Sequence, residues 1–152
     1  RIFQAIRTVK ELRPETQVVF PVYKNPKVRG LAWEVLGDIP GVHLIEPMDY
    51  QPFAHLMAKS YLVLTDSGGM QEEAPSLGKP VLVMRETTER PEAVEAGTVK
   101  LVGTAKENII KEALDLIDND SSYREMAVAA NPYGDGKAAR RIVQAIRRFS
   151  ES

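Results

Sequence analysis

A hydroxyl and two adjacent glycines stand together in the segment Ser67-Gly68-Gly69, shortly after the apolar run Tyr61–Leu64. Because a glycine has no Cβ atom, its backbone can approach a phosphate closely. If a helix begins here, its first N–H groups and its positive end favour an anion. The segment therefore predicts a phosphate-binding turn, with the Ser67 hydroxyl as a further donor. A strand-to-helix turn that only requires small residues has the same composition, so this alternative stays open.

Acidic residues flank this turn. Glu73 lies four residues after Gly69, on the first turns of the expected helix, where a carboxylate can accept hydrogen bonds from two ribose hydroxyls. It also fits an acid that is there only because the helix dipole favours it. Asp66 could cap the start of the helix. The segment is not a GxGxxG fingerprint and no Walker lysine follows it, so these residues alone indicate no more than a possible phosphate site.

Five short apolar runs must position these residues. Most of them lack strict polar alternation, as expected for strands that are buried on both faces of a parallel sheet. Helices are predicted between them at about 26–37, 50–59, 69–77 and 90–96. This alternation predicts an α/β fold with an open parallel sheet flanked by helices, and the Ser67 turn at the carboxyl edge of that sheet. The runs are Val18–Val22, Val42–Ile45, Tyr61–Leu64, Val81–Met84 and Val99–Val102.

The last third of the chain has a helical pattern only. Helices are predicted at about 105–118, 121–130 and 136–150, and the last one, a closing helix, would fit packing onto a neighbouring domain. The chain also opens inside a helical pattern without an N-cap, which favours one domain (residues 1–152) cut from a longer protein. The apolar stripe of the closing helix comprises Ala139, Ile142, Val143, Ile146 and Phe149.

Composition limits the classes of function. Hydrophobic residues make up 43% and charged residues 27% of the 152 residues, which is typical of a globular protein with a core. The formal net charge of −1 does not favour binding to nucleic acid or to an anionic membrane. The chain has no cysteine, which excludes disulfides and thiolate chemistry and is compatible with a reducing cytoplasm.

The longer sequence around the turn is a more specific indicator of a protein family than the turn itself. Residues 66–85 read DSGGMQEEAPSLGKPVLVMR, and residues 86–93 read ETTERPEA. The pairs Pro21-Val22 and Asn25-Pro26 upstream and the segment Tyr133-Gly134-Asp135-Gly136 downstream belong to the same pattern. Over essentially its whole length, the chain closely resembles the C-terminal domain of the non-hydrolysing UDP-N-acetylglucosamine 2-epimerases.

The resemblance implies a Rossmann-like domain, the C-terminal half of a two-domain GT-B type fold, in which this half holds UDP. Arg90 matches a ligand-contacting arginine, and a guanidinium suits a pyrophosphate. Phe53 falls where relatives stack a ring on uracil, and Met48 lies near the base through its backbone. The local sequence alone favours a core position for Phe53 over a base platform, and Arg90 also fits a surface arginine beside a turn. The UDP site would comprise Met48, Phe53, Ser67, Gly68, Gly69, Glu73 and Arg90.

The implied activity is the interconversion of UDP-GlcNAc and UDP-ManNAc by elimination and re-addition of UDP. The catalytic carboxylates of the family belong to an N-terminal domain that this chain lacks, so the chain alone should be inactive, with no catalytic residue, no metal and no cofactor. The complete protein is expected to be a cytoplasmic homodimer that serves cell-envelope polysaccharide biosynthesis. Tyr23 stands where relatives often have a histidine that contacts a regulatory substrate molecule. The alternative is a GT-B glycosyltransferase with the same UDP site.

Overall fold

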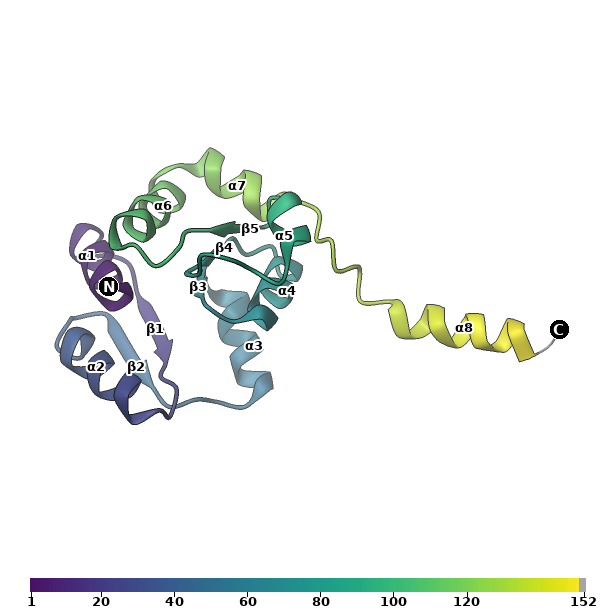
Figure 1. Ribbon diagram of the computed structural model, residues 1–152, viewed down its shortest axis with the longest axis horizontal. Helices are drawn as coiled ribbons and strands as arrows, with labels where there is room; N and C mark the ends of the chain where they lie inside the picture. Colours follow the sequence, from purple (N-terminus) through teal and green to yellow (C-terminus); the bar gives the residue numbers. More distant parts are fainter. Residues whose placement is uncertain (151–152) are drawn as a thin grey trace.

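The computed structural model describes residues 1–150, in which strands and helices alternate before a helical last third (Figure 1). The strands are β1 (Val18–Pro21), β2 (Val42–Ile45), β3 (Val63–Thr65), β4 (Val81–Val83) and β5 (Val99–Leu101). The helices are α1 (Ile2–Leu12), α2 (Pro26–Leu36), α3 (Tyr50–Lys59), α4 (Gly68–Ser76), α5 (Pro91–Glu95), α6 (Lys106–Asp118), α7 (Asp120–Val128) and α8 (Ala138–Ser150). Each predicted strand and helix is present within about two residues of its expected bounds.

Every strand pair in the described residues is parallel, as predicted. Strand β1 pairs with β2, from Val18 opposite Val42 to Pro21 opposite Ile45. Strands β3, β4 and β5 form a second ladder with β4 in the middle. The backbone hydrogen bonds thus divide the strands into two groups. Helix α1 connects the groups, because it leads into β1 and packs against both α2 and α6.

Strand β4 is buried on both faces, which explains its unbroken apolar run. Leu82 contributes to one core cluster with residues of α1 and α6, such as Ala5 and Ile109. Val81 and Val83 contribute to a second cluster, on the opposite face of the strand. This second cluster includes Met57 of α3, Ala74 of α4 and Ala93 of α5. The β3–β5 sheet is therefore the middle layer of a three-layer α/β/α arrangement, as its periodicity predicts.

The connections after β3 and β4 leave the sheet at the same edge. Strand β3 ends at Thr65 and leads into α4, while β4 ends at Val83 and leads through residues 84–90 into α5. Parallel strands direct their carboxyl ends to one edge, where open α/β sheets bind ligands. The Ser67 turn and the segment that carries Arg90 are therefore neighbours, although about twenty residues separate them.

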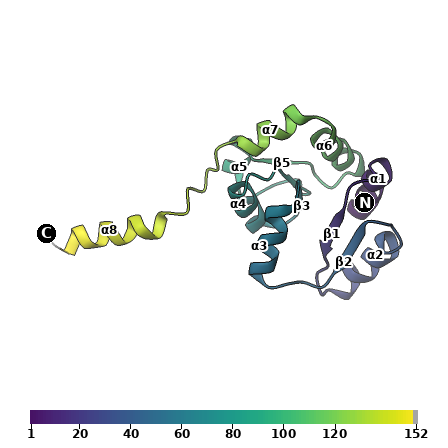
Figure 2. The same cartoon turned by 180° about the vertical axis from the view of Figure 1, so that it is seen from behind.

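Helix α8 extends away from the rest of the molecule at the end of an irregular segment, as both views show (Figures 1 and 2). None of its described residues is buried, and Ile142, Val143 and Ile146 are 57%, 47% and 62% exposed. The predicted apolar stripe is thus present, and its packing onto a neighbouring domain stays a prediction. Within residues 1–150, no helix is long and apolar enough to cross a membrane.

Candidate functional site

The Ser67-Gly68-Gly69 segment joins β3 to α4. Helix α4 begins at Gly68, and Ser67 is its N-cap residue with an extended backbone (φ −89°, ψ 135°). The alternative in which Asp66 caps this helix is therefore wrong. The backbone N–H of Ser67 donates to Thr65 Oγ1 at 3.0 Å, but its hydroxyl caps no N–H group of α4. The first N–H groups of α4 have no acceptor within the helix, so they can bind an anion at this edge.

The chain itself does not require the two glycines of this turn. Neither Gly68 nor Gly69 has a positive φ, so no left-handed conformation demands a glycine. A Cβ atom on Gly68 would meet nothing within 4 Å. On Gly69 it would lie 3.9 Å from Glu73 Oε1 and 3.9 Å from Ser67 Oγ, which is ordinary contact. Since neither packing nor backbone strain explains the glycines, the geometry favours close approach of a ligand over a turn that merely needs small residues.

Glu73 places a carboxylate beside this turn with unused hydrogen-bonding capacity. Its Oε2 atom is buried and has no hydrogen-bond partner among the described residues. Its Oε1 atom lies close to the position that a side chain on Gly69 would occupy. A buried oxygen that accepts no hydrogen bond costs free energy, and native proteins contain few of them. A ligand hydroxyl above Gly69 would lie beside Oε1 of this carboxylate.

Arg90 lies on the neighbouring connection and is paired with α4. It is the N-cap residue of α5, and its guanidinium donates from Nε to the carboxylate of Glu72. This hydrogen bond raises the pKa of Arg90, and the Coulombic attraction of Glu72 adds to the effect. The side chain of Arg90 is 35% exposed, so solvent reaches the guanidinium. The structure therefore brings Arg90 and the Ser67 turn to the same edge, where Glu72 of α4 pairs with the arginine.

A buried glutamine in α4, which the sequence analysis did not single out, connects the two segments. Gln71 is 0% exposed, and its Nε2 donates to the carbonyl oxygen of Ser67 at 3.3 Å. The hydroxyl of Thr88 donates to Gln71 Oε1, and Thr88 Oγ1 accepts the backbone N–H of Arg90 at 3.0 Å. The only sign of this contact in the sequence is the spacing, because Gln71 follows Ser67 by four residues, about one helical turn.

Met48 lies before α3 and Phe53 lies within it. Met57 of the same helix shares a core cluster with Ala74 of α4. The side chains of Met48 and Phe53 are half-buried, so neither is a full core residue. Their expected contacts with a base stay a prediction. Tyr23 follows β1 and is 72% exposed.

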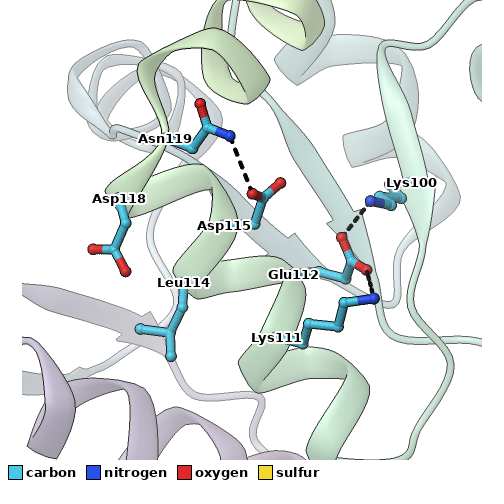
Figure 3. A pocket seen from close by; sticks show the side chains of 7 residues that line it. All are labelled: Lys100, Lys111, Glu112, Leu114, Asp115, Asp118 and Asn119. Carbon is cyan, nitrogen blue, oxygen red and sulfur yellow. Dashed lines mark hydrogen bonds and ion pairs between the residues drawn. The ribbon is translucent and has the colours of Figure 1, made fainter.

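Two hollows on the surface of the described residues lie away from the Ser67 turn. One, of about 450 Å³, is bounded by α6 and by Lys100 of β5 (Figure 3). In it, Lys100 pairs with Glu112, and Asn119 donates to Asp115 at 3.5 Å. A second hollow, of about 410 Å³, lies beside it among α5, β5, α6 and α7. Neither includes a residue of the Ser67 turn.

Comparison with known proteins identifies the family to which the chain belongs. The family model for UDP-N-acetylglucosamine 2-epimerase matches residues 1–147. The chain belongs to this family. It is 56% identical to the UDP-N-acetylglucosamine 2-epimerase of Bacillus subtilis, over 94% of this chain and 38% of that protein. The chain thus spans about two fifths of the length of the curated relatives that it matches.

Solved structures of the UDP-N-acetylglucosamine 2-epimerase family have the same fold. The Neisseria meningitidis UDP-GlcNAc 2-epimerase bound to UDP-GlcNAc superposes with a TM-score of 0.91 at 50% identity, covering 97% of this chain and 40% of that one. The co-structure of Staphylococcus aureus MnaA with UDP gives a TM-score of 0.93 at 50% identity, covering 99% and 41%. The family and the Rossmann-like α/β class predicted from the sequence are therefore confirmed.

Proposed function

We propose that this chain binds the UDP part of UDP-GlcNAc at the Ser67 turn, and that the complete protein interconverts UDP-GlcNAc and UDP-ManNAc. The observation that carries the proposal is Glu73, whose buried Oε2 lacks a partner among the described residues beside two glycines that the chain does not need. Membership of the UDP-N-acetylglucosamine 2-epimerase family supports it. So do relatives solved with UDP-GlcNAc or UDP bound.

Each side chain has a distinct part in binding. The Ser67 hydroxyl and the N–H groups of Gly68 and Gly69 donate to the diphosphate, which the positive end of α4 also attracts. Glu73 accepts hydrogen bonds from the ribose hydroxyls. Arg90 adds a positive charge for the diphosphate, in competition with its pairing to Glu72. Phe53 and Met48 face the uracil, Phe53 through its ring and Met48 through its backbone.

The reaction needs this site because UDP is the leaving group. A base removes the proton from C2 of the sugar while the C1–O bond to the diphosphate breaks, which forms a C1–C2 double bond and releases UDP. UDP then adds back to C1, and a proton returns to the other face of C2. Negative charge accumulates on the diphosphate as the bond breaks, and the N–H groups of α4 with Arg90 stabilise it. The acid and base groups come from a second domain.

The chain, on this proposal, is the C-terminal domain of a GT-B type fold. The exposed apolar stripe of α8 and the greater length of the relatives support a second domain, onto which α8 packs. The open edge at the Ser67 turn then becomes one wall of a cleft between the domains, and this chain alone is inactive. The complete protein is a cytoplasmic homodimer, for which light scattering in solution should give twice the mass of one chain.

Incubation of the complete protein with UDP-GlcNAc tests the proposed activity. UDP-ManNAc should appear without any acceptor, and deuterium from heavy water should enter at C2 because the proton there is exchanged. Turnover that requires an acceptor would instead establish the glycosyltransferase alternative. Failure of the protein to bind UDP in calorimetry would overturn the site as well.

A further inference from the structure

The side-chain amide of Gln71 is buried in the interior of the molecule, out of reach of a ligand. The residue is 0% exposed, and both ends of its amide are bonded within the chain. Burying an amide costs free energy unless its hydrogen bonds are satisfied, and an apolar side chain of similar size would fill the same space without that cost. The amide is therefore best explained by what it connects.

The hydrogen bonds of Gln71 join the two segments of the candidate site. On one side, Nε2 donates to the Ser67 carbonyl, at the start of α4. On the other side, Oε1 accepts from the Thr88 hydroxyl, whose oxygen also accepts the N–H of Arg90 at 3.0 Å. A continuous chain of hydrogen bonds thus runs from the Ser67 backbone to the Arg90 backbone. It sets the separation between the turn and the arginine before any ligand binds.

We propose that Gln71 is a positioning residue, which holds Arg90 and the Ser67 turn at the spacing that a diphosphate requires. The inference rests on the proposed function, since it assumes that both segments contact the diphosphate. Preorganisation explains why an amide is kept here, because groups fixed in place before binding lose less entropy when the ligand arrives. Gln71 itself touches no ligand atom and acts through Thr88 and Arg90.

The substitution Gln71→Met in the complete protein tests this role, because methionine fills a similar volume and lacks the amide. We expect about tenfold weaker binding of UDP, the loss typical of one misdirected charge-assisted contact. Binding of uridine should change less than about twofold, because uridine lacks the diphosphate that the two segments hold. Gln4→Met, an equivalent change at an exposed position of α1, serves as the matched control and should alter neither.

A second variant separates positioning from stability. Gln71→Met leaves the Thr88 hydroxyl without its acceptor, so some loss of stability should accompany it. Adding Thr88→Val removes the unsatisfied hydroxyl and should restore much of that stability. The double variant should still bind UDP about tenfold more weakly, because the hydrogen-bonded link from the Ser67 carbonyl to the Arg90 backbone is still missing.

Three results would overturn the inference while leaving the proposed function intact: unchanged UDP binding in Gln71→Met, an equal loss for uridine and UDP, or recovery of UDP binding in the double variant. Failure of the wild-type protein to bind UDP would overturn the inference and the proposed function together.

Discussion

At the scale of single residues, the adjacent acids Glu72 and Glu73 have different environments. Glu72 accepts a hydrogen bond from Arg90, whereas Glu73 keeps a buried oxygen without a partner among the described residues. Such an oxygen lowers the stability of the chain by itself. Binding sites commonly retain a destabilising group of this kind, because the ligand supplies what the protein lacks. On the proposed function, the dipeptide thus divides into one acid that pairs with Arg90 and one that accepts hydrogen bonds from the ligand.

The substitution Glu73→Gln tests this division of roles. It removes the charge that two ribose hydroxyls would share, so we expect UDP binding to weaken roughly 10- to 100-fold, the range for hydrogen bonds to a charged group. The melting temperature should stay the same or rise, since the buried oxygen without a partner no longer belongs to a charged group. Calorimetry and thermal unfolding measure the two quantities, with Glu125→Gln on the exposed side of α7 as control. Undiminished UDP binding would remove Glu73 from the ribose role.

At the scale of elements, a glycine fixes where α4 ends. Its last turn is followed by Gly78 in the left-handed region (φ +66°), and the N–H of Gly78 donates to the Pro75 carbonyl at 3.0 Å. A left-handed glycine at this position ends the helix and directs the chain into β4. The β4–α5 connection that carries Arg90 follows, so this glycine helps to place one of the two segments of the site.

Two glycine substitutions should have opposite effects on stability. Gly78→Ala puts a Cβ on a left-handed residue and should cost about 1–2 kcal/mol. Gly30 lies inside α2 with nothing within 4 Å of a built Cβ, so Gly30→Ala should stabilise the protein by up to about 1 kcal/mol. Denaturant unfolding of the two variants beside the wild type measures both. A Gly78→Ala variant as stable as the wild type would contradict the assigned cap.

At the scale of the whole molecule, the apolar face of α8 is left uncovered by the rest of the described residues. Ile142, Val143 and Ile146 are each about half exposed or more, while arginines occupy the opposite side of the helix. Isolated helices of this length are marginal in water, so packing of the apolar face is what usually stabilises them. This supports a second domain in the complete protein as the surface that α8 covers.

The substitution Ile146→Asp in the complete protein tests this packing. A charge buried between α8 and a second domain should lower the melting temperature by several degrees, as buried unpaired charges do. Gln144→Asp introduces the same charge on the polar face of α8 and should have little effect. Equal melting temperatures for both variants would show that the stripe of α8 stays exposed in the complete protein.

The sequence by itself determines the elements and the family. The apolar runs, the glycine after α4 and the proline at the start of α5 are local signals, because each acts on its own neighbours in the chain. They predict α4 at about 69–77 where the structure has Gly68–Ser76. The amino-acid sequence around Ser67 identifies the UDP-N-acetylglucosamine 2-epimerase family, which the comparison with known proteins confirms.

Only the tertiary structure decides which side chains meet. Gln71 and Thr88 are 17 residues apart, and Glu72 and Arg90 are 18 apart, so no local pattern pairs them. Their contacts depend on how α4 and α5 pack side by side on the β3–β5 sheet. The same packing decides that Gly68 faces open space and that Glu73 Oε2 lacks a partner within the described chain. The Ser67 turn was predictable as a motif because its residues are consecutive. Its connection to Arg90 was not, because separate elements supply the two ends.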